Sequence, residues 1–271
     1  MLSNGWLESP GITADDDFVE TCYGDGNRRN YSYHYDKSMY TSLWTAYPLY
    51  SSTVNGNNDG GWRANPGIDN TQQINVWDGP YSVNVGSTTS EGYSSASLYY
   101  ARGHQIPDAD RDNDATMLSQ TYYATNSTPQ IHSGFNSGIW SSLENGVRDV
   151  LPSTDTIYVV TGPAFNKVGE SKPITYITPK NDTKACPVPN YYWKVVLKVK
   201  RDGKGILEAC AVGFWLEHRA YSAANGEVYA NYAVSVDQIE QWTGLDLFVN
   251  LPDALESVAE TNSDWPLFQN F

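Results

Sequence analysis

Short apolar runs separated by polar turns dominate the chain, and this pattern is typical of β-strands. Three tyrosines occupy alternate positions of residues 29–36, RNYSYHYD, so one face of that strand is aromatic. Residues 155–165, DTIYVVTGPAF, form a nearly continuous β-branched run that a Gly-Pro pair ends. Two further runs, residues 191–199 and 206–216, flank the stretch RDGK, which predicts a β-hairpin with an Asp-Gly turn.

Two helices are predicted from apolar spacing and capping residues. Residues 235–244, SVDQIEQWTG, begin with Ser235 as N-cap, carry Gln238 in a capping box and end at Gly244. Residues 136–147, NSGIWSSLENGV, place Ile, Leu and Val at four-residue intervals, so one face is expected to pack on the sheet.

Asn136 and Glu144 are the polar residues of interest in the second helix. On a regular helix they project within roughly 80° of each other and lie about 12 Å apart along the axis. They can therefore serve one site without both touching one ion. Taken alone, the asparagine would be an N-cap and the glutamate a solvated surface acid.

The organisation of the chain indicates a single domain. Residues 51–61 and 84–96, rich in Ser, Asn, Thr and Gly, are interpreted as surface loops, and no repeat or domain boundary is evident. At 271 residues the chain is long enough to bury a sizeable core. The predicted fold is α+β over residues 1–271, with a central, mainly antiparallel sheet flanked by helices.

The charge balance weighs against a strong general attraction to polyanions. The formal net charge is −14, so a nucleic acid would be repelled at long range unless basic residues gather on one face. No apolar run approaches the roughly 18 residues of a membrane span, and the first residues lack the features of a signal peptide. With 20 Tyr, 9 Trp and only 18% charged residues, the composition is typical of a secreted or periplasmic protein in its mature form.

Three cysteines, Cys22, Cys186 and Cys210, fit no zinc-binding spacing. In an oxidising compartment, one disulfide and one free thiol are expected. Pairing of Cys186 with Cys210 meets a geometric objection: about the Asp-Gly turn, Cys210 would face Val195, roughly 30 Å along the ladder from Cys186.

Candidate chemistry begins in residues 99–111, YYARGHQIPDADR. Gly103 permits a close approach of other atoms beside His104, which suits an outward-facing histidine. Within about forty residues the chain then offers strand, turn, second strand and helix. In order along the chain come a cation, a base, two amides and a carboxylate, which are Arg102, His104, Asn126, Asn136 and Glu144.

The ordered elements RGHQIP, NSTPQ and FNSGIWSSLE resemble the signature of the DNA/RNA non-specific endonucleases, which are ββα-metal (His-Me finger) nucleases. The resemblance continues more weakly through YVVTGPAF, YYWKVVLKV, AVGFW and WTGLDLFVNLP, and places the ββα-metal finger at about residues 97–149. It implies a metal-dependent endonuclease that hydrolyses phosphodiester bonds in DNA and RNA.

Carried over by position, the resemblance makes His104 the general base and Asn136 the direct ligand of Mg²⁺, or of Mn²⁺ or another divalent cation. Glu144 would act on the ion through water, and Arg102 and Asn126 would assist at the phosphate. Ala101 stands where the family usually has an acidic residue. This departure leaves the general base and the metal ligand in place, but it puts in doubt how firmly the surrounding loop is held.

These residue types suit phosphodiester hydrolysis. Neutral imidazole, with a reference pKa near 6.5, accepts a proton from water near neutral pH. Mg²⁺ prefers oxygen ligands and keeps several waters, so one amide oxygen leaves room for the phosphate. We expect a local basic patch to bind the nucleic acid, formed by Arg102 with Arg63, Arg111 and Arg148.

Several residues have simpler interpretations. Arg102 could instead pair with Asp108 or Asp110, and Asn126 could hold the turn before Pro129. The other three histidines are expected to be structural, and most Tyr and Trp residues are expected in the core and at sheet edges.

Three classes of function follow. The first is the metal-dependent, sequence-indifferent nuclease. The second is a weakened nuclease fold that binds nucleic acid without cutting it, suggested by Ala101 and the acidic charge. The third is a secreted, glycan-binding β-rich domain, suggested by the Tyr, Trp, Asn and Gly content. Digestion of plasmid DNA with Mg²⁺, and its loss in EDTA, separates the first two.

Overall fold

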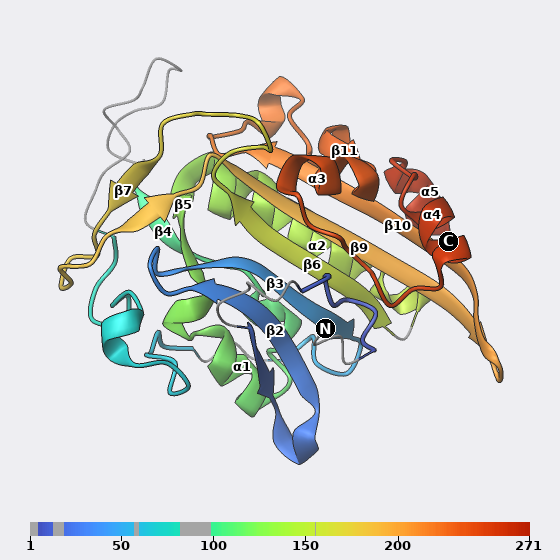
Figure 1. Ribbon diagram of the computed structural model, residues 1–271, viewed down its shortest axis with the longest axis horizontal. Coiled ribbons are helices and arrows are strands. Elements are labelled where there is room, and N and C mark those ends of the chain that lie inside the picture. The colour runs from blue at the N-terminus through green and yellow to red at the C-terminus, as the bar shows by residue number, and fades with distance from the viewer. Residues whose placement is uncertain (1–4, 13–18, 57–59, 82–98, 155) are drawn as a thin grey trace.

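A computed structural model describes residues 5–12, 19–56, 60–81, 99–154 and 156–271. Its centre is a seven-stranded antiparallel sheet in the order β1-β2-β3-β6-β9-β10-β11. The strands are β1 Val19–Tyr23, β2 Arg29–Asp36, β3 Thr41–Tyr50, β6 Thr156–Ala164, β9 Tyr191–Asp202, β10 Gly205–Glu217 and β11 Ala233–Val234. The predicted α+β class with a mainly antiparallel sheet is confirmed (Figure 1).

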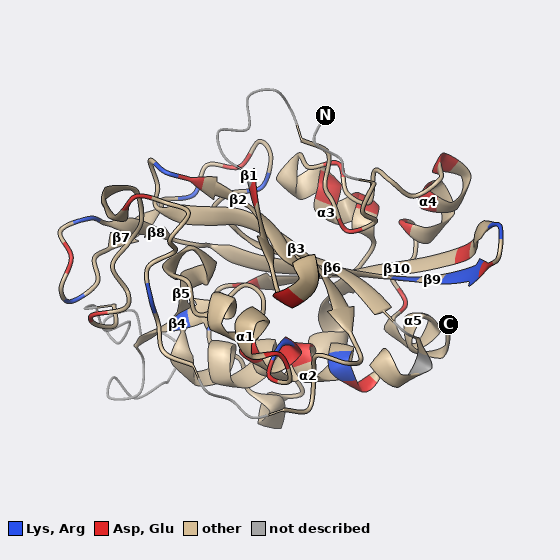
Figure 2. Ribbon diagram, turned by 90° about the horizontal axis from the view of Figure 1, so that it is seen from below, with Lys and Arg blue, Asp and Glu red and all other residues tan. Residues whose placement is uncertain are grey.

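Helices cover both faces of this sheet (Figure 2). One face carries α3 Val236–Thr243 and α4 Asp253–Ala259. The other carries α1 Ala115–Thr121, α2 Ser141–Asp149 and α5 Trp265–Asn270, with the short pair β4 Tyr100–His104 and β5 Ser127–Ile131. A second short pair joins β7 Thr175–Ile177 to β8 Cys186–Val188.

The alternation of side chains along the strands creates two cores. Tyr192, Val196 and Val212 contribute to the core under α2, whereas Trp193 and Val195 point to the core under α3. Because successive side chains in a strand point to opposite faces, a strand buried on both sides is apolar throughout. The structure confirms that most of the large aromatics lie in these cores, among them Trp44, Trp140, Trp193, Tyr31, Tyr33, Tyr35 and Tyr47.

The β9–β10 hairpin forms as predicted, but its predicted register is wrong. Gly203 and Lys204 occupy the turn rather than Asp202 and Gly203, which shifts the pairing by two residues. A bulge near Leu207 shifts it by one more, so Cys210 faces Lys198 instead of Val195. The Asp202 carboxylate accepts hydrogen bonds from the amides of Lys204 and Gly205, which holds this turn.

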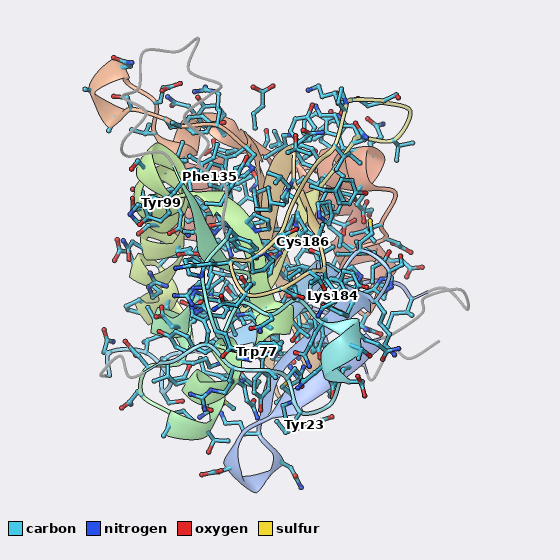
Figure 3. The ribbon with its side chains drawn as sticks, turned by 90° about the vertical axis from the view of Figure 1, so that its left-hand side faces the viewer. Tyr23, Trp77, Tyr99, Phe135, Lys184 and Cys186 are labelled. Atoms are coloured by element: carbon cyan, nitrogen blue, oxygen red, sulfur yellow. The ribbon has the colours of Figure 1, made fainter. Side chains whose placement is uncertain are left out.

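All three cysteines are free and buried, so the expected disulfide is absent. Burial raises the pKa of the Cys22 and Cys186 thiols to about 12, which keeps both protonated at neutral pH. Cys186 lies in β8 (Figure 3), five residues before β9 begins at Tyr191 and far along the chain from the β9–β10 turn.

The remaining histidines lie in structural contacts, as predicted. His34 packs edge-on against Trp44, and His132 stacks on the Tyr99 ring with centroids 4.5 Å apart. His218 is enclosed by aromatic rings and connects β5 to the end of β10, because its Nε2 accepts the Ile131 amide 2.8 Å away. In the part of the chain that the structure describes, no helix has the length and apolarity needed to cross a membrane.

Candidate active site

The predicted ββα finger is built from β4, β5 and α2, over Tyr100–Asp149, and residues 97 and 98 lie outside the described residues. β4 and β5 pair antiparallel, with His104 opposite Ser127 and Ala101 opposite Gln130. A Cβ atom on Gly103 would lie 2.3 Å from the Gln130 side chain, so only glycine allows that side chain to cross β4. Figure 3 labels Tyr99 and Phe135, which flank this strand pair along the chain.

His104 ends β4 with its ring held between two aromatic side chains. The Trp62 ring centroid is 4.6 Å away, and the Tyr122 ring stands perpendicular to it at 4.9 Å. Burial lowers the pKa of His104, Asp108 raises it less, and Arg102 lowers it further. The Nε2 atom is buried without a hydrogen-bond partner among the described residues. His104 is therefore a neutral imidazole with a free proton acceptor.

Arg102 shares the Trp62 ring with His104. Its guanidinium donates a hydrogen bond to the Val76 carbonyl at 2.9 Å and lies 5.6 Å from the Trp62 ring centroid. The alternative ion pair with Asp108 or Asp110 does not form among the residues that the structure covers. A fixed cation therefore stands next to the candidate base.

Asn126 holds the segment that follows His104. Its Nδ2 donates to the carbonyls of Ile106 and Thr121, and its Oδ1 accepts the Ile106 amide at 3.0 Å. The side chain is buried, and its amide group is fully used by these bonds. Asn126 therefore has a structural role rather than direct contact with a phosphate, although its side chain bonds Ile106 and Thr121 and not the turn before Pro129.

The prediction of one regular helix from Asn136 is wrong. Residues 132–140 form an irregular helical segment, and the regular helix α2 begins only at Ser141. Gly134 has φ +80° and lies against the backbone of Tyr221, and Gly138 also departs from helical dihedrals. The angle and separation expected of Asn136 and Glu144 on a straight helix therefore do not apply. The apolar face of the segment is nevertheless buried, as the spacing predicts.

Asn136 is oriented by β5. Its Nδ2 donates to Gln130 Oε1 at 2.7 Å, which leaves Oδ1 without a partner among the described residues. Since Gln130 crosses β4 above Gly103, the two strands of the finger together set the orientation of this amide. Among described residues, Asn136 and His104 make no hydrogen bond to each other.

Glu144 lies on α2 beside a buried lysine that the sequence did not single out. Burial raises the pKa of Glu144 to about 7, while Lys194 and Arg148 lower it and Asp110 and Asp108 raise it. Lys194, on β9, is 1% exposed, and its Nζ has no hydrogen-bond partner among the residues that the structure describes. Burial lowers the pKa of Lys194, and the nearby Glu144 opposes that shift. Both groups thus shift toward their neutral forms.

Asp110 and Arg148 connect α2 to the turn after β4. The Arg148 guanidinium lies 2.6 Å from Asp110 Oδ1, and the Tyr47 hydroxyl donates to Asp110 Oδ2 at 2.8 Å. Asp108, two residues earlier, affects the pKa of both His104 and Glu144. The candidate base and the α2 carboxylate therefore share one electrostatic environment.

The predicted role of Arg111 in substrate binding is wrong, because the side chain is 0% exposed. Its guanidinium donates to Asn30, Pro48 and the Asp110 carbonyl, so it is a buried link between β2 and β3. Arg63, by contrast, is exposed and donates to Ser119 Oγ at 2.7 Å. It lines a surface hollow of about 490 Å³ together with Ser119 and Asp112.

Sequence reasoning missed Gln130, Lys194 and Trp62. Lys194 had a usable signal, because a lysine inside the apolar run of residues 191–199 must be buried or paired. Gln130 had a weaker one, as the last letter of NSTPQ. The role of Trp62 depends on a contact more than forty residues away along the chain, which no local pattern reveals.

The site offers oxygen donors suited to a divalent cation. Asn136 Oδ1 is directed by its amide hydrogen bond to Gln130, and the Glu144 carboxylate makes no hydrogen bond or close ion pair among the described residues. A hard cation such as Mg²⁺ prefers this kind of amide and carboxylate oxygen. The residues present therefore fit such an ion.

Comparisons with known proteins identify the family of this chain. The family model described as DNA/RNA non-specific endonuclease matches residues 20–254. A nuclease of Serratia marcescens is 26% identical over 233 residues, which cover 85% of this chain and 77% of that protein. A nuclease of Syncephalastrum racemosum is 31% identical over 159 residues, 56% of this chain and 48% of that protein. Nuclease 1, mitochondrial, of Schizosaccharomyces pombe is 27% identical over 157 residues, 56% of this chain.

The matched stretch spans about half the length of the last two relatives, 48% and 47%. Among solved structures, the crystal structure of the EndoG/EndoGI complex matches with a TM-score of 0.65 and 19% identity. It covers 89% of this chain and 90% of the other, so the likeness concerns the fold.

Proposed function

Because this chain belongs to the DNA/RNA non-specific endonuclease family, we propose that it hydrolyses phosphodiester bonds in DNA and RNA without sequence preference. His104 carries the proposal, because its buried Nε2 has no partner among the described residues and burial lowers its pKa. An imidazole that is neutral near pH 7 and has a free nitrogen can accept a proton from water.

The chain's own residues account for the proton transfer. Water attacks phosphorus and forms the new P–O bond while the bond to the leaving oxygen breaks. The proton lost by this water goes to His104 Nε2, and the leaving oxygen takes a proton from solvent. Trp62 and Tyr122 hold the imidazole ring, and Asn126 fixes the turn that follows it. We assign Asn126 a positioning role.

We propose that Asn136 Oδ1 binds a divalent cation directly and that Glu144 acts on it through water. The metal would be Mg²⁺, or Mn²⁺ or another divalent ion. When bound, such an ion supplies positive charge that stabilises the transition state of phosphodiester hydrolysis. Gln130 orients the ligand amide, and Lys194 with Arg148 favours the charged form of Glu144.

The substrate backbone would meet Arg102 and the exposed Arg63, with Arg148 nearby. Contacts of arginine with phosphate oxygens carry no base preference, which suits a nuclease indifferent to sequence. We also propose a secreted or periplasmic location, on the strength of the composition alone; fractionation of the producing cells tests it.

The test is digestion of a plasmid and of a structured RNA with Mg²⁺, with Mn²⁺ and in EDTA. His104→Ala is expected to cut both substrates about 10²–10⁴-fold more slowly, the usual size of a general-base contribution. His132→Ala is the matched control, because His132 lies in the same finger and stacks on Tyr99. Equal loss in both variants would assign His104 to structure, and uncut nucleic acid that is still bound would favour a binding protein.

A further inference from the structure

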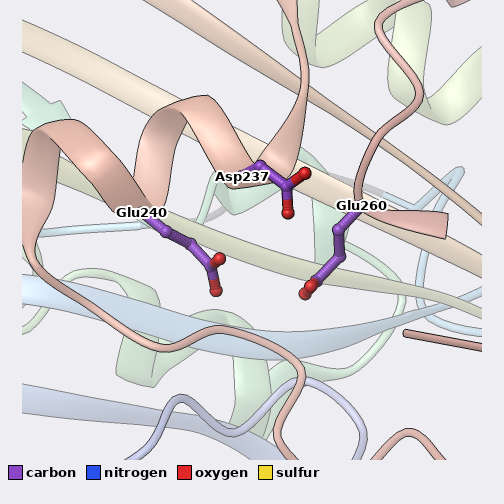
Figure 4. A group of neighbouring side chains, drawn as sticks. All are labelled: Asp237, Glu240 and Glu260. Atoms are coloured by element: carbon purple, nitrogen blue, oxygen red, sulfur yellow. The ribbon is translucent and has the colours of Figure 1, made fainter. Parts of the chain in front are cut away.

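A group of three carboxylates lies on the face of the sheet opposite α2. Asp237 and Glu240 belong to the first turns of α3, and Glu260 directly follows α4. One oxygen from each lies within 4.8 Å of the others. Figure 4 shows the Glu240 and Glu260 side chains extending toward one another, with the Asp237 carboxylate on the same side.

Glu260 is the buried member of this group. The residue is 5% exposed, and its Oε1 accepts no hydrogen bond among the described residues. Its backbone carbonyl accepts the amides of Val236 and Asp237, at 2.9 and 3.3 Å, which fixes it against the start of α3. A buried carboxylate oxygen without a donor is costly, so a missing partner is expected at this point.

The charges around Glu260 do not supply that partner. The charged groups with the largest effect on its pKa are all acids, Glu240, Glu256, Asp237 and Asp246. Glu240 is partly satisfied, because its Oε1 accepts the Leu247 amide at 2.6 Å, and its other oxygen is left for a further partner.

We propose that Asp237, Glu240 and Glu260 bind a Ca²⁺ ion that links α3 to the end of α4. Ca²⁺ binds six to eight oxygens at about 2.3–2.6 Å, so two oxygens that share it lie at most about 5 Å apart, as these do. The exposed Asp237 leaves one side open to water, which completes the coordination. Mg²⁺ is less suited, because it keeps its waters and usually takes only one or two carboxylates.

This ion has a structural role that is independent of the proposed nuclease site. Val236, Ile239 and Ala259 pack in the core between α3, α4 and the sheet. An ion joining the two helices stabilises that layer in the folded chain only. The other face of the same sheet carries α2 (Figure 2), and Phe135 and Ile139 on either side of Asn136 share a core with α2, so the two cation sites are separate.

The test is thermal unfolding of the full chain during a Ca²⁺ titration from a chelated start. At free Ca²⁺ of about 100 times the dissociation constant, the ratio of folded to unfolded protein rises about 100-fold, which corresponds to a Tm increase of about 5 °C. Asn136→Ala should show the same increase, since it alters only the α2 side. Glu260→Gln should show none, and in chelator it should unfold near the wild-type Tm because the amide keeps the size and shape of the carboxyl.

Glu208→Gln is the control, because Glu208 is exposed and pairs with Lys200 on the β9–β10 hairpin. A Ca²⁺ response in Glu260→Gln equal to wild type, or no response in any protein, would overturn the proposal. An equal response to Mg²⁺ would overturn the choice of Ca²⁺. If Glu260→Gln does not fold, Asp237→Asn, at an exposed position, gives the same comparison. DNA cleavage by Glu260→Gln, Asp237→Asn and Glu208→Gln in Mg²⁺ should equal wild type, which keeps this test distinct from that of the nuclease proposal.

Discussion

At the scale of single residues, Lys194 and Glu144 define the character of the candidate site. Within the described part of the chain, this buried lysine has no hydrogen-bond partner, and it lies close enough to the Glu144 carboxylate, with its pKa of about 7, for each to shift the pKa of the other. The Lys194 Nζ lies 5.1 Å from the Trp140 ring centroid, so an aromatic face replaces water around it. Its positive charge keeps Glu144 ionised at a lower pH than burial alone would allow.

Lys194→Met tests this coupling. Loss of the positive charge should raise the pKa of Glu144 above about 7, since Lys194 is the largest influence that lowers it. The acid limb of the profile of kcat/KM against pH should then move to higher pH. At a fixed pH on that limb, kcat/KM should fall about tenfold for each unit by which the pKa of Glu144 rises. Lys198→Met is the control, because Lys198 is also buried on β9 but lies by Phe268 of α5. Equal profiles for wild type and Lys194→Met would exclude the coupling.

Asn136 and Glu144 should differ in how extra metal restores activity. Asn136→Ala removes the proposed direct ligand, so cleavage should collapse with little recovery at high Mg²⁺. Glu144→Gln retains an oxygen but loses the charge, so the apparent metal affinity should fall about 10–100-fold and recover partly at high Mg²⁺. A Mg²⁺ titration of cleavage rate for both variants is the measurement. The reverse order of recovery would mean that Glu144, and not Asn136, is the direct ligand.

At the scale of elements, local patterns predicted the hairpin, the β6 strand and α3, whose Ser235 N-cap accepts the Gln238 amide as a capping box requires. They did not predict the register of β9 on β10, because turn position and bulge depend on which residue caps the turn. Apolar spacing likewise identified the buried face of residues 136–147. The break before Ser141 was not predicted, because it depends on the contact of Gly134 with Tyr221.

His218 gives the attachment of β5 to β10 a pH dependence. Burial lowers the pKa of His218 to about 4, so the unfolded chain binds its proton at higher pH than the folded chain does. The neutral His218 therefore makes its full contribution to the free energy of unfolding above about pH 6.5. That contribution, about 3 kcal/mol, is lost as pH falls toward 4. Once protonated, His218 Nε2 could no longer accept the hydrogen bond from the Ile131 amide.

Urea unfolding between pH 7 and pH 4 measures this loss. His218→Gln, whose side chain cannot gain a proton in this range, should be less stable than wild type at pH 7 and should show a smaller loss on acidification. The half-buried His132 serves as the comparison, and His132→Gln should keep the wild-type dependence. An unchanged dependence in His218→Gln would assign the acid sensitivity to other groups.

At the scale of the whole molecule, one cluster of acidic residues lies apart from the candidate site. Asp237, Glu240, Asp246, Glu256 and Glu260 gather around α3 and α4, on the face away from the finger (Figure 2). The sequence gives the net charge of −14 but not this separation, because the sides of a sheet are assigned only when the chain folds. The face that carries the finger has its own acids, Asp108, Asp110 and Glu144, so nucleic acid bound there depends on the arginines of that face.

Few arginines remain available on that face, and this limits the dependence of DNA binding on salt. Arg111 is fully buried and Arg148 pairs with Asp110, which leaves Arg63 and Arg102 as the main contacts. Each neutralised phosphate contributes about −0.9 to the slope of log affinity against log salt, so a slope of about −2 to −3 is expected.

The measurement is duplex binding by His104→Ala, which should not consume the DNA, between 50 and 200 mM salt, roughly the range over which such slopes are resolved. Arg63→Ala should reduce the slope by about 1, whereas Arg201→Ala, at the exposed tip of β9, should leave it unchanged. A slope steeper than about −5 would require basic groups beyond these two, and the nucleic acid would then have to contact a larger surface than the finger and its neighbouring loop.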